Sequence, residues 1–168
     1  IWLAGCTLFE SPTLFILSRF NADGSIDSTF NEVGYKEYVT DTGDENKLRD
    51  MLLQPDGKVV LGGRVMNRAT KQYNFGLMRI HPDGLEDSTF GDNGRLLTAP
   101  NGSAEASADL SKLLLQSDGK ILGLGTSNTG TRVYIPFSTI VRYYGNGMSS
   151  IAVKSNQYKF SVFPNPAS

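Results

Sequence analysis

Short apolar segments of strand length recur along the chain, separated by polar stretches rich in Gly, Asp and Asn. One complete set occupies residues 48–54, 58–65, 73–80 and 95–98. Each segment is an apolar run or alternation of four to eight residues, which is typical of β-strands. No window of eleven or more residues between them has the periodicity of an amphipathic helix. The pattern therefore predicts four strands within about 50 residues.

The connection between the first two of these segments has the composition of a tight hairpin turn. Pro55 fixes its own φ, Asp56 suits the third turn position, and Gly57 accepts a left-handed conformation. The return segment contains the pair Gly62 and Gly63, which marks a place where side chains would crowd a neighbouring element.

The segments belong to an internal repeat. Residues 22–30 return as residues 82–90, an offset of 82 − 22 = 60, and residues 53–58 return as residues 115–120, an offset of 62. Two further landmarks occur three times each in the same order, residues 17–20, 77–80 and 140–143, and residues 3–5, 61–63 and 122–125. A fixed order of four landmarks indicates a tandem array.

Tandem units of four antiparallel strands favour an all-β fold, a partial β-propeller made of four-stranded antiparallel blades of about 60 residues. A β-sandwich is the alternative, but it does not explain why turns and loops return at one spacing. We expect an incomplete first blade at 1–40 that lacks its first strand, a second at 46–99, and a third, terminal and degenerate blade at 108–153. Residues 154–168 then form a linker and the start of another domain. Because so few blades cannot close a ring, preceding blades are expected before Ile1.

Composition removes several classes of partner and chemistry. Sixteen basic and seventeen acidic residues give a net charge of −1, so neither nucleic acid nor an anionic membrane is an expected partner. No apolar run approaches the roughly 20 residues of a membrane span. The single cysteine, Cys6, can form neither an internal disulfide nor a zinc site, and within an apolar run we expect it to be buried and inert. No cofactor motif is present.

The repeated sequence resembles the delta-60 repeat family, which occurs in tandem in large secreted bacterial proteins. The resemblance rests on the motif around residues 19–30 and 79–90 and on residues 53–63 and 115–125. It implies propeller blades of an extracellular scaffold, with no family catalytic residues and no cofactor. The positions that recur with the motif, expected to maintain the blade, are Arg19, Asp23, Gly24, Asp27, Phe30, Asp56, Gly57, Arg79, Asp83, Gly84, Asp87, Phe90, Asp118, Gly119 and Arg142.

The third copy departs from this motif after Arg142, where residues 143–148 contain neither loop aspartate. Terminal units of repeat arrays are often atypical. We therefore expect the third blade to be the last, with an outer strand that is degenerate or supplied by the N-terminal end of the array.

The last eleven residues alternate aromatic and polar positions and then enter a Pro-Asn-Pro turn at Pro164, Asn165 and Pro166. This segment resembles the opening of a type A C-terminal sorting domain of the type IX secretion system of Bacteroidetes-type bacteria. The resemblance implies a chain that contacts that secretion machinery and is secreted or attached to the cell surface. The alternative is an ordinary loop at a domain end.

Four loop aspartates, Asp23, Asp27, Asp83 and Asp87, have a spacing similar to short calcium loops. The favoured interpretation is structural: the first of each pair forms a turn, the second caps the Ser-Thr turn that follows, and Phe30 anchors the loop in the core.

Other polar residues are also expected to be structural. Arg19, Arg79 and Arg142 should pair with turn aspartates or loop carbonyls within or between blades, although a ring of ligand-binding arginines is an alternative. His81, the only histidine, precedes a turn and is expected to be exposed and structural. The sequence as a whole favours a non-enzymatic scaffold, adhesion or binding module for an extracellular protein or glycan. A carbohydrate-active hydrolase with catalytic residues elsewhere and a calcium-stabilised array are the alternatives.

Overall fold

The computed structural model describes residues 1–7, 13–40, 46–100, 106–128, 136–145 and 149–155, the last as backbone only. Within these ranges the chain forms β-strands and turns, and no helix that could cross a membrane. The strands are β1 (Trp2–Cys6), β2 (Leu14–Arg19), β3 (Tyr35–Val39), β4 (Lys47–Leu53), β5 (Val59–Met66), β6 (Tyr73–Ile80), β7 (Arg95–Thr98), β8 (Ala108–Leu115), β9 (Ile121–Ser127), β10 (Phe137–Tyr143) and β11 (Ser149–Ser155).

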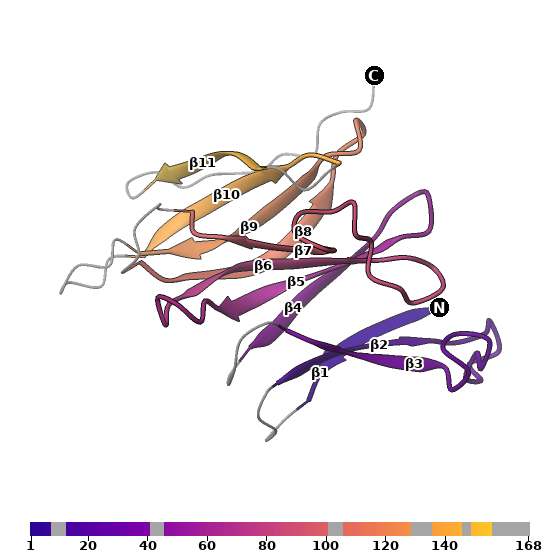
Figure 1. Ribbon diagram of the computed structural model, residues 1–168. Coiled ribbons are helices and arrows are strands. Elements are labelled where there is room, and N and C mark those ends of the chain that lie inside the picture. The colour runs from indigo at the N-terminus through magenta and orange to yellow at the C-terminus, as the bar shows by residue number, and fades with distance from the viewer. Residues whose placement is uncertain (8–12, 41–45, 101–105, 129–135, 146–148, 156–168) are drawn as a thin grey trace.

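The strands form three antiparallel sheets, in the orders β1-β2-β3, β4-β5-β6-β7 and β11-β10-β9-β8 (Figure 1). All neighbours along the chain within a sheet are hydrogen-bonded partners, which is the meander expected of a propeller blade. The predicted all-β class and the predicted strands of the second sheet are confirmed, with ends that differ by one residue at most. In the first sheet β1 corresponds to β5, and the described residues include no strand of that sheet that corresponds to β4.

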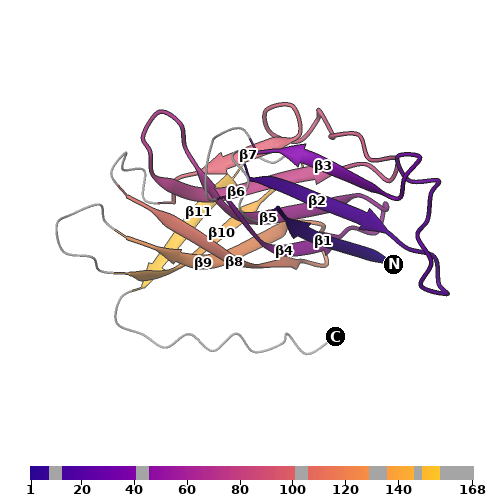
Figure 2. The same cartoon turned by 90° about the horizontal axis from the view of Figure 1, so that it is seen from below.

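The three sheets pack face to face, and the second lies between the other two (Figures 1 and 2). Alternate residues of its strands therefore enter two separate cores, because successive side chains point to opposite faces of a sheet. Leu61 and Met78 pack with Phe15 and Leu17 of the first sheet. Val60, on the opposite face, packs among side chains of the third sheet. This two-sided burial makes β5 continuously apolar, where a half-exposed strand would alternate.

The glycines of β5 lie where the sequence predicts crowding. A Cβ on Gly63 would lie 2.0 Å from the carbonyl oxygen of Lys47 in β4, and one on Gly62 would lie 2.8 Å from Leu113 of the third sheet. The close backbone approach at Gly63 coincides with a bulge in β4, where the pairing with β5 shifts between Leu48 and Asp50. The same arrangement returns in the third sheet, where Gly125 faces the carbonyl oxygen of Asp109.

The outer strand of the third sheet differs from one expectation. β11 belongs to this chain and pairs with β10 from Ser138↔Ser155 to Tyr143↔Ser149, so the N-terminal end of an array does not supply that strand. It also extends two residues past the expected boundary at 153. A strand at the outer edge of a sheet pairs with one neighbour only. The short apolar segment at residues 151–153 is therefore enough to form this strand.

Cys6 also departs from expectation, because it is half-buried. β1 is an edge strand with an alternating pattern of half-buried and exposed residues, whereas the equivalent β5 is almost completely buried. An apolar sequence predicts burial only where neighbouring strands cover it, and β1 has such a neighbour on one side.

Candidate functional site between the sheets

The recurring loop motif folds around an arginine near the end of a strand, which is β2 in the first sheet and β6 in the second. In the first sheet, Arg19 Nε donates to Asp27 Oδ2 over 2.8 Å, and its Nη2 donates to Thr29 Oγ1 over 2.7 Å. The other oxygen of Asp27 accepts from the Thr29 amide over 3.0 Å, which closes the turn. The guanidinium lies 5.2 Å from the ring centre of Phe30, which is fully buried. The turn cap and aromatic anchor are thus present as predicted.

The second copy repeats this geometry in an environment that is less exposed to solvent. Arg79 Nε donates to Asp87 Oδ2 over 2.8 Å, and the guanidinium lies 4.5 Å from the ring centre of Phe90. The side chains of Arg79 and Asp87 are 6% and 1% exposed, against 22% and 20% for Arg19 and Asp27. The second cluster is therefore a buried ion pair, and its integrity should matter more to stability.

The arginines also join neighbouring sheets. Arg19 Nη1 donates to the carbonyl oxygen of Pro82 in the second unit over 3.1 Å, and Arg79 Nη1 donates to that of Gly145 in the third. Each acceptor stands three residues after the arginine of the next unit. The predicted pairing with turn aspartates and loop carbonyls is therefore present for these two arginines.

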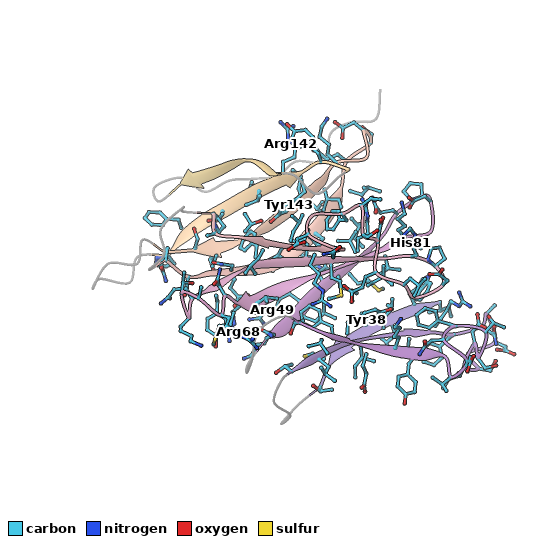
Figure 3. The ribbon with its side chains drawn as sticks, in the orientation of Figure 1. Tyr38, Arg49, Arg68, His81, Arg142 and Tyr143 are labelled. Atoms are coloured by element: carbon cyan, nitrogen blue, oxygen red, sulfur yellow. The ribbon has the colours of Figure 1, made fainter. Side chains whose placement is uncertain are left out.

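The third arginine lies apart from such a cluster. Arg142 stands near the end of β10 (Figure 3), and its charge helps to lower the pKa of Asp118, after the stronger effects of the Lys120 side chain and amide. The aspartate and phenylalanine that surround Arg19 and Arg79 have no counterpart in the sequence that follows Arg142. The three arginines thus occupy equivalent positions in their strands, and within the described residues Arg19 and Arg79 form complete clusters.

The charge of Asp87 is strongly stabilised. Burial raises the pKa of its carboxyl, but the hydrogen bonds from Thr89 and the charges of Arg79 and Lys58 outweigh burial and hold the pKa well below its ordinary value. His81 also faces this carboxylate, with 3.5 Å between its Nε2 and Asp87 Oδ1. The expectation of an exposed histidine was therefore too simple, because its side chain is 39% exposed and packs on the cluster.

The remaining motif aspartates form turns. One carboxylate oxygen of Asp23, Asp56, Asp83 and Asp118 accepts the backbone amide two residues further along the chain. The glycine that follows each aspartate has a positive φ, 86° at Gly24, 83° at Gly57, 89° at Gly84 and 80° at Gly119. These residues therefore shape the loops, and the structure places Asp23 and Asp83 in turns separate from the carboxylates of Asp27 and Asp87.

Calcium is expected not to stabilise the described sheets. The oxygens of Asp27 and Asp87 already accept hydrogen bonds from arginine and threonine, and the described residues contain no group of three or more His, Cys, Asp or Glu placed to hold an ion. Millimolar CaCl2 should therefore leave the thermal melting temperature within about 1 °C of its value in EDTA. MgCl2 at equal ionic strength is the control. A calcium-specific rise of several degrees would contradict this result.

Sequence reasoning missed a second set of charged contacts, on the inner strands. The guanidinium of Arg49 in β4 forms two hydrogen bonds to the carboxylate of Asp109 near the start of β8, over 3.1 and 2.7 Å. Asp50 accepts the amide of Leu113 over 2.8 Å and pairs with Lys112. The residues of each pair differ between repeats, so repeat comparison gave no signal. The only signal is opposite charge about one repeat apart.

A polar pocket lies beside these contacts, between the second and third sheets. It encloses about 300 Å³ and is lined by residues of β5, β6, β8 and β9 with their neighbours, among them Arg64, Tyr73, Asp109, Thr126 and Asn128. The guanidinium of Arg64 stacks 4.0 Å from the ring centre of Tyr73. An aromatic ring beside hydroxyl, amide and carboxylate groups is suited to a small polar ligand.

Comparison with known proteins gives one family. The family described as "Domain of unknown function (DUF5122) beta-propeller" matches residues 1–30 and 54–90, which include both complete arginine–aspartate clusters. A search of the curated proteins finds no match. The match agrees with the three antiparallel sheets, so the architecture is that of partial β-propeller blades.

Proposed function

We propose that this chain is a non-enzymatic part of a β-propeller that serves as a scaffold and binding module. The proposal rests on the contacts that the recurring charged residues make. Arg19 and Arg79 are engaged with their aspartates and with carbonyls of the next sheet, so the groups that the repeat maintains join blades to one another. Groups committed to such contacts are poorly placed to act as general acids, bases or nucleophiles.

The binding role falls to residues that differ between repeats. The polar pocket around Tyr73 and Asp109 contains such a residue. Asp109 in the third unit is replaced by Lys47 at the equivalent position of the second unit. Its polar groups and aromatic ring suit a glycan or another small polar molecule of the extracellular medium.

A glycan array with the purified chain tests the proposal. We expect binding of at least one glycan, about tenfold weaker in Asp109→Asn, because the variant removes a charged acceptor from the pocket. The matched control is Asp118→Asn, which removes an aspartate charge from a hairpin turn. Equal weakening in both variants would argue against this pocket, and release of reducing sugar from a bound glycan would argue against a non-enzymatic module.

We further propose that the protein is exported by a type IX secretion system to the cell surface or the medium. The support is the Tyr/Phe-rich alternation that ends in residues 163–167, and these residues, with Pro164, Asn165 and Pro166, lie outside the described part of the chain. In the source bacterium, intact cells treated with protease should lose the protein, and a secretion-deficient strain should retain it in the periplasm. Recovery in the cytoplasm of both strains would contradict this proposal.

A further inference from the structure

An apolar pocket lies between the first and second sheets, close to the outer strand β7. It encloses about 150 Å³ and is lined by residues of β2, β5, β6 and β7 and by Thr40, which directly follows β3. Its walls include Phe15, Val65 and Met78, which belong to the core between these two sheets. Leu97 of β7 also lines the pocket and is 41% exposed, so the pocket is open to solvent beside β7.

A row of small residues in the second sheet borders this pocket. Gly63, Gly76 and Leu97 are register partners across β5, β6 and β7, so they lie on the same face of the sheet. Val65 and Met78 follow the two glycines by two residues and pack toward the first sheet, so the row faces the first sheet as well. Leu97 is therefore the only residue of this row that has a side chain.

The corresponding rows of the other two sheets differ in both respects. From the inner to the outer strand, the rows of the first, second and third sheets are Gly5-Ile16-Glu37, Gly63-Gly76-Leu97 and Gly125-Thr139-Lys154. The middle position has a side chain in the first and third sheets, and the outer position is charged in both. Residues that maintain the blade recur between units, so these two adjacent differences indicate a property particular to the second sheet.

The third sheet shows how the space beside the middle position is filled elsewhere. Ser127 and Thr139 are the equivalents of Val65 and Gly76, and their hydroxyl oxygens lie 2.7 Å apart. In the second sheet a Cβ on Gly76 would lie 2.3 Å from a methyl carbon of Val65. Val65 therefore occupies part of the space of the absent side chain, and the pocket has an apolar wall where the third sheet has a hydrogen-bonded pair.

Polar groups with fixed positions also line the pocket. Arg95 donates two hydrogen bonds to the carboxylate of Glu86, over 2.7 and 2.8 Å. The hydroxyl of Thr40 donates to a backbone carbonyl and accepts from the amide of Asn46. Because Glu86 balances the charge of Arg95 and Asp92 adds a negative charge, the polar side of the pocket suits an uncharged group better than an anion. A few fixed polar groups in an apolar pocket orient a ligand.

We propose that this pocket binds a small uncharged molecule of the phenol class, which has one apolar ring and one hydroxyl group. A dry apolar cavity of about 150 Å³ accommodates a molecule the size of benzene. The ring packs against Phe15, Met78 and Leu97. The hydroxyl faces the polar groups of Thr40 and Arg95. This inference does not depend on the glycan pocket or on the route of export.

An NMR titration of the isotopically labelled chain with p-cresol tests the proposal. The amide signals of Gly76, Met78 and Leu97 should shift and saturate, while those of residues 107–109 at the glycan pocket should stay unchanged. Toluene lacks the hydroxyl and should bind about fivefold more weakly. Benzoate carries a charge and should give no saturable shift. Equal affinity for toluene and p-cresol, or saturable binding of benzoate, would overturn the assignment of an uncharged hydroxyl compound.

Two variants copied from the other sheets alter the pocket in ways that the fold already accepts. The double variant Val65→Ser, Gly76→Thr reproduces the hydroxyl pair of the third sheet, and Leu97→Glu reproduces the charged outer position of the first. Each should weaken p-cresol binding about tenfold or more, the first by filling the pocket and the second by placing a charge beside the ring. Unchanged affinity in both variants would exclude this pocket as the site.

The matched control is Glu37→Leu, which makes the reverse change at the equivalent position of the first sheet. Glu37 and Leu97 are both exposed, so the two single variants should melt close to the unaltered chain. Glu37→Leu should leave p-cresol binding unchanged, because residue 37 does not line the pocket. Weaker binding in Glu37→Leu of the same size as in Leu97→Glu would overturn the proposal.

The side chain of a tyrosine in another protein carries the same ring and hydroxyl. N-acetyltyrosinamide presents that ring together with a peptide backbone, which is larger than the pocket and should weaken binding relative to p-cresol. Stronger binding of N-acetyltyrosinamide would overturn the assignment of a small molecule, in favour of a tyrosine supplied by a partner protein.

Discussion

Replacing Asp87 with alanine is expected to lower the free energy of unfolding by about 3–5 kcal/mol, because it leaves the guanidinium of Arg79 buried without its charge partner. The two side chains are 6% and 1% exposed, and the lost carboxylate also caps the turn at Thr89. Urea denaturation followed by circular dichroism measures the effect. Since a chain of this size has only modest stability, the variant should be partly unfolded at 25 °C.

Asp27→Ala is the matched variant, because Asp27 occupies the same place in the first unit with a similar set of partners. Its ion pair with Arg19 is about one-fifth exposed, so we expect a loss of about 1 kcal/mol. A loss of equal size in both variants would show that burial of the pair does not set its importance.

The same pair predicts an acid response. The pKa of Asp87 is lowered in the folded state, so its contribution to stability is complete above about pH 4 and is lost as pH falls through the folded value. The free energy of unfolding, measured between pH 7 and pH 2, should therefore decrease more steeply at the acid end for the unaltered chain than for Asp87→Asn. Parallel curves would exclude Asp87 as a source of the acid response.

Gly63→Ala is expected to cost about 3 kcal/mol or more, at the upper end of what overpacking costs. The new Cβ would lie 2.0 Å from the carbonyl oxygen of Lys47, an atom of the backbone that cannot rotate away. Relief requires β4 to shift, which breaks the pairing at the bulge between Leu48 and Asp50. Thermal unfolding and urea denaturation both measure the loss.

The control for this prediction is Gly5→Ala, at the equivalent position of the first sheet. Its added methyl meets open space, so we expect a change within about 0.5 kcal/mol. If both alanine variants were equally stable, the bulge would have to be soft enough to move at little cost. If both were strongly destabilised, the glycines would be needed for backbone conformation and not for space.

Much of the fold follows from the sequence because its signals are local. The turn at Pro55, Asp56 and Gly57 is specified by the conformational preferences of those residues, and the strands on either side by apolar runs of strand length. Because the sequence repeats, the same local prediction applies to all three sheets. The roles of Asp27 and Phe30 were predictable for the same reason, since a turn cap and a loop anchor act within one unit.

Features that join units were much harder to predict. Arg49 and Asp109 meet across two sheets, and neither residue recurs at its equivalent position, so no comparison within the chain could pair them. The half-buried state of Cys6 has a similar origin, because the burial of an apolar strand depends on the sheets and strands that pack against it.

By itself the sequence determined the repeat, the strands, the tight turns and the arginine–aspartate motif of the first two units, because all of these depend on residues close together in the chain. Only the tertiary structure decided which copy of the motif is buried and which charges join the inner strands. Those properties depend on the distance between sheets and on the neighbours each sheet has, and identical motifs at Asp27 and Asp87 therefore differ in exposure from 20% to 1%.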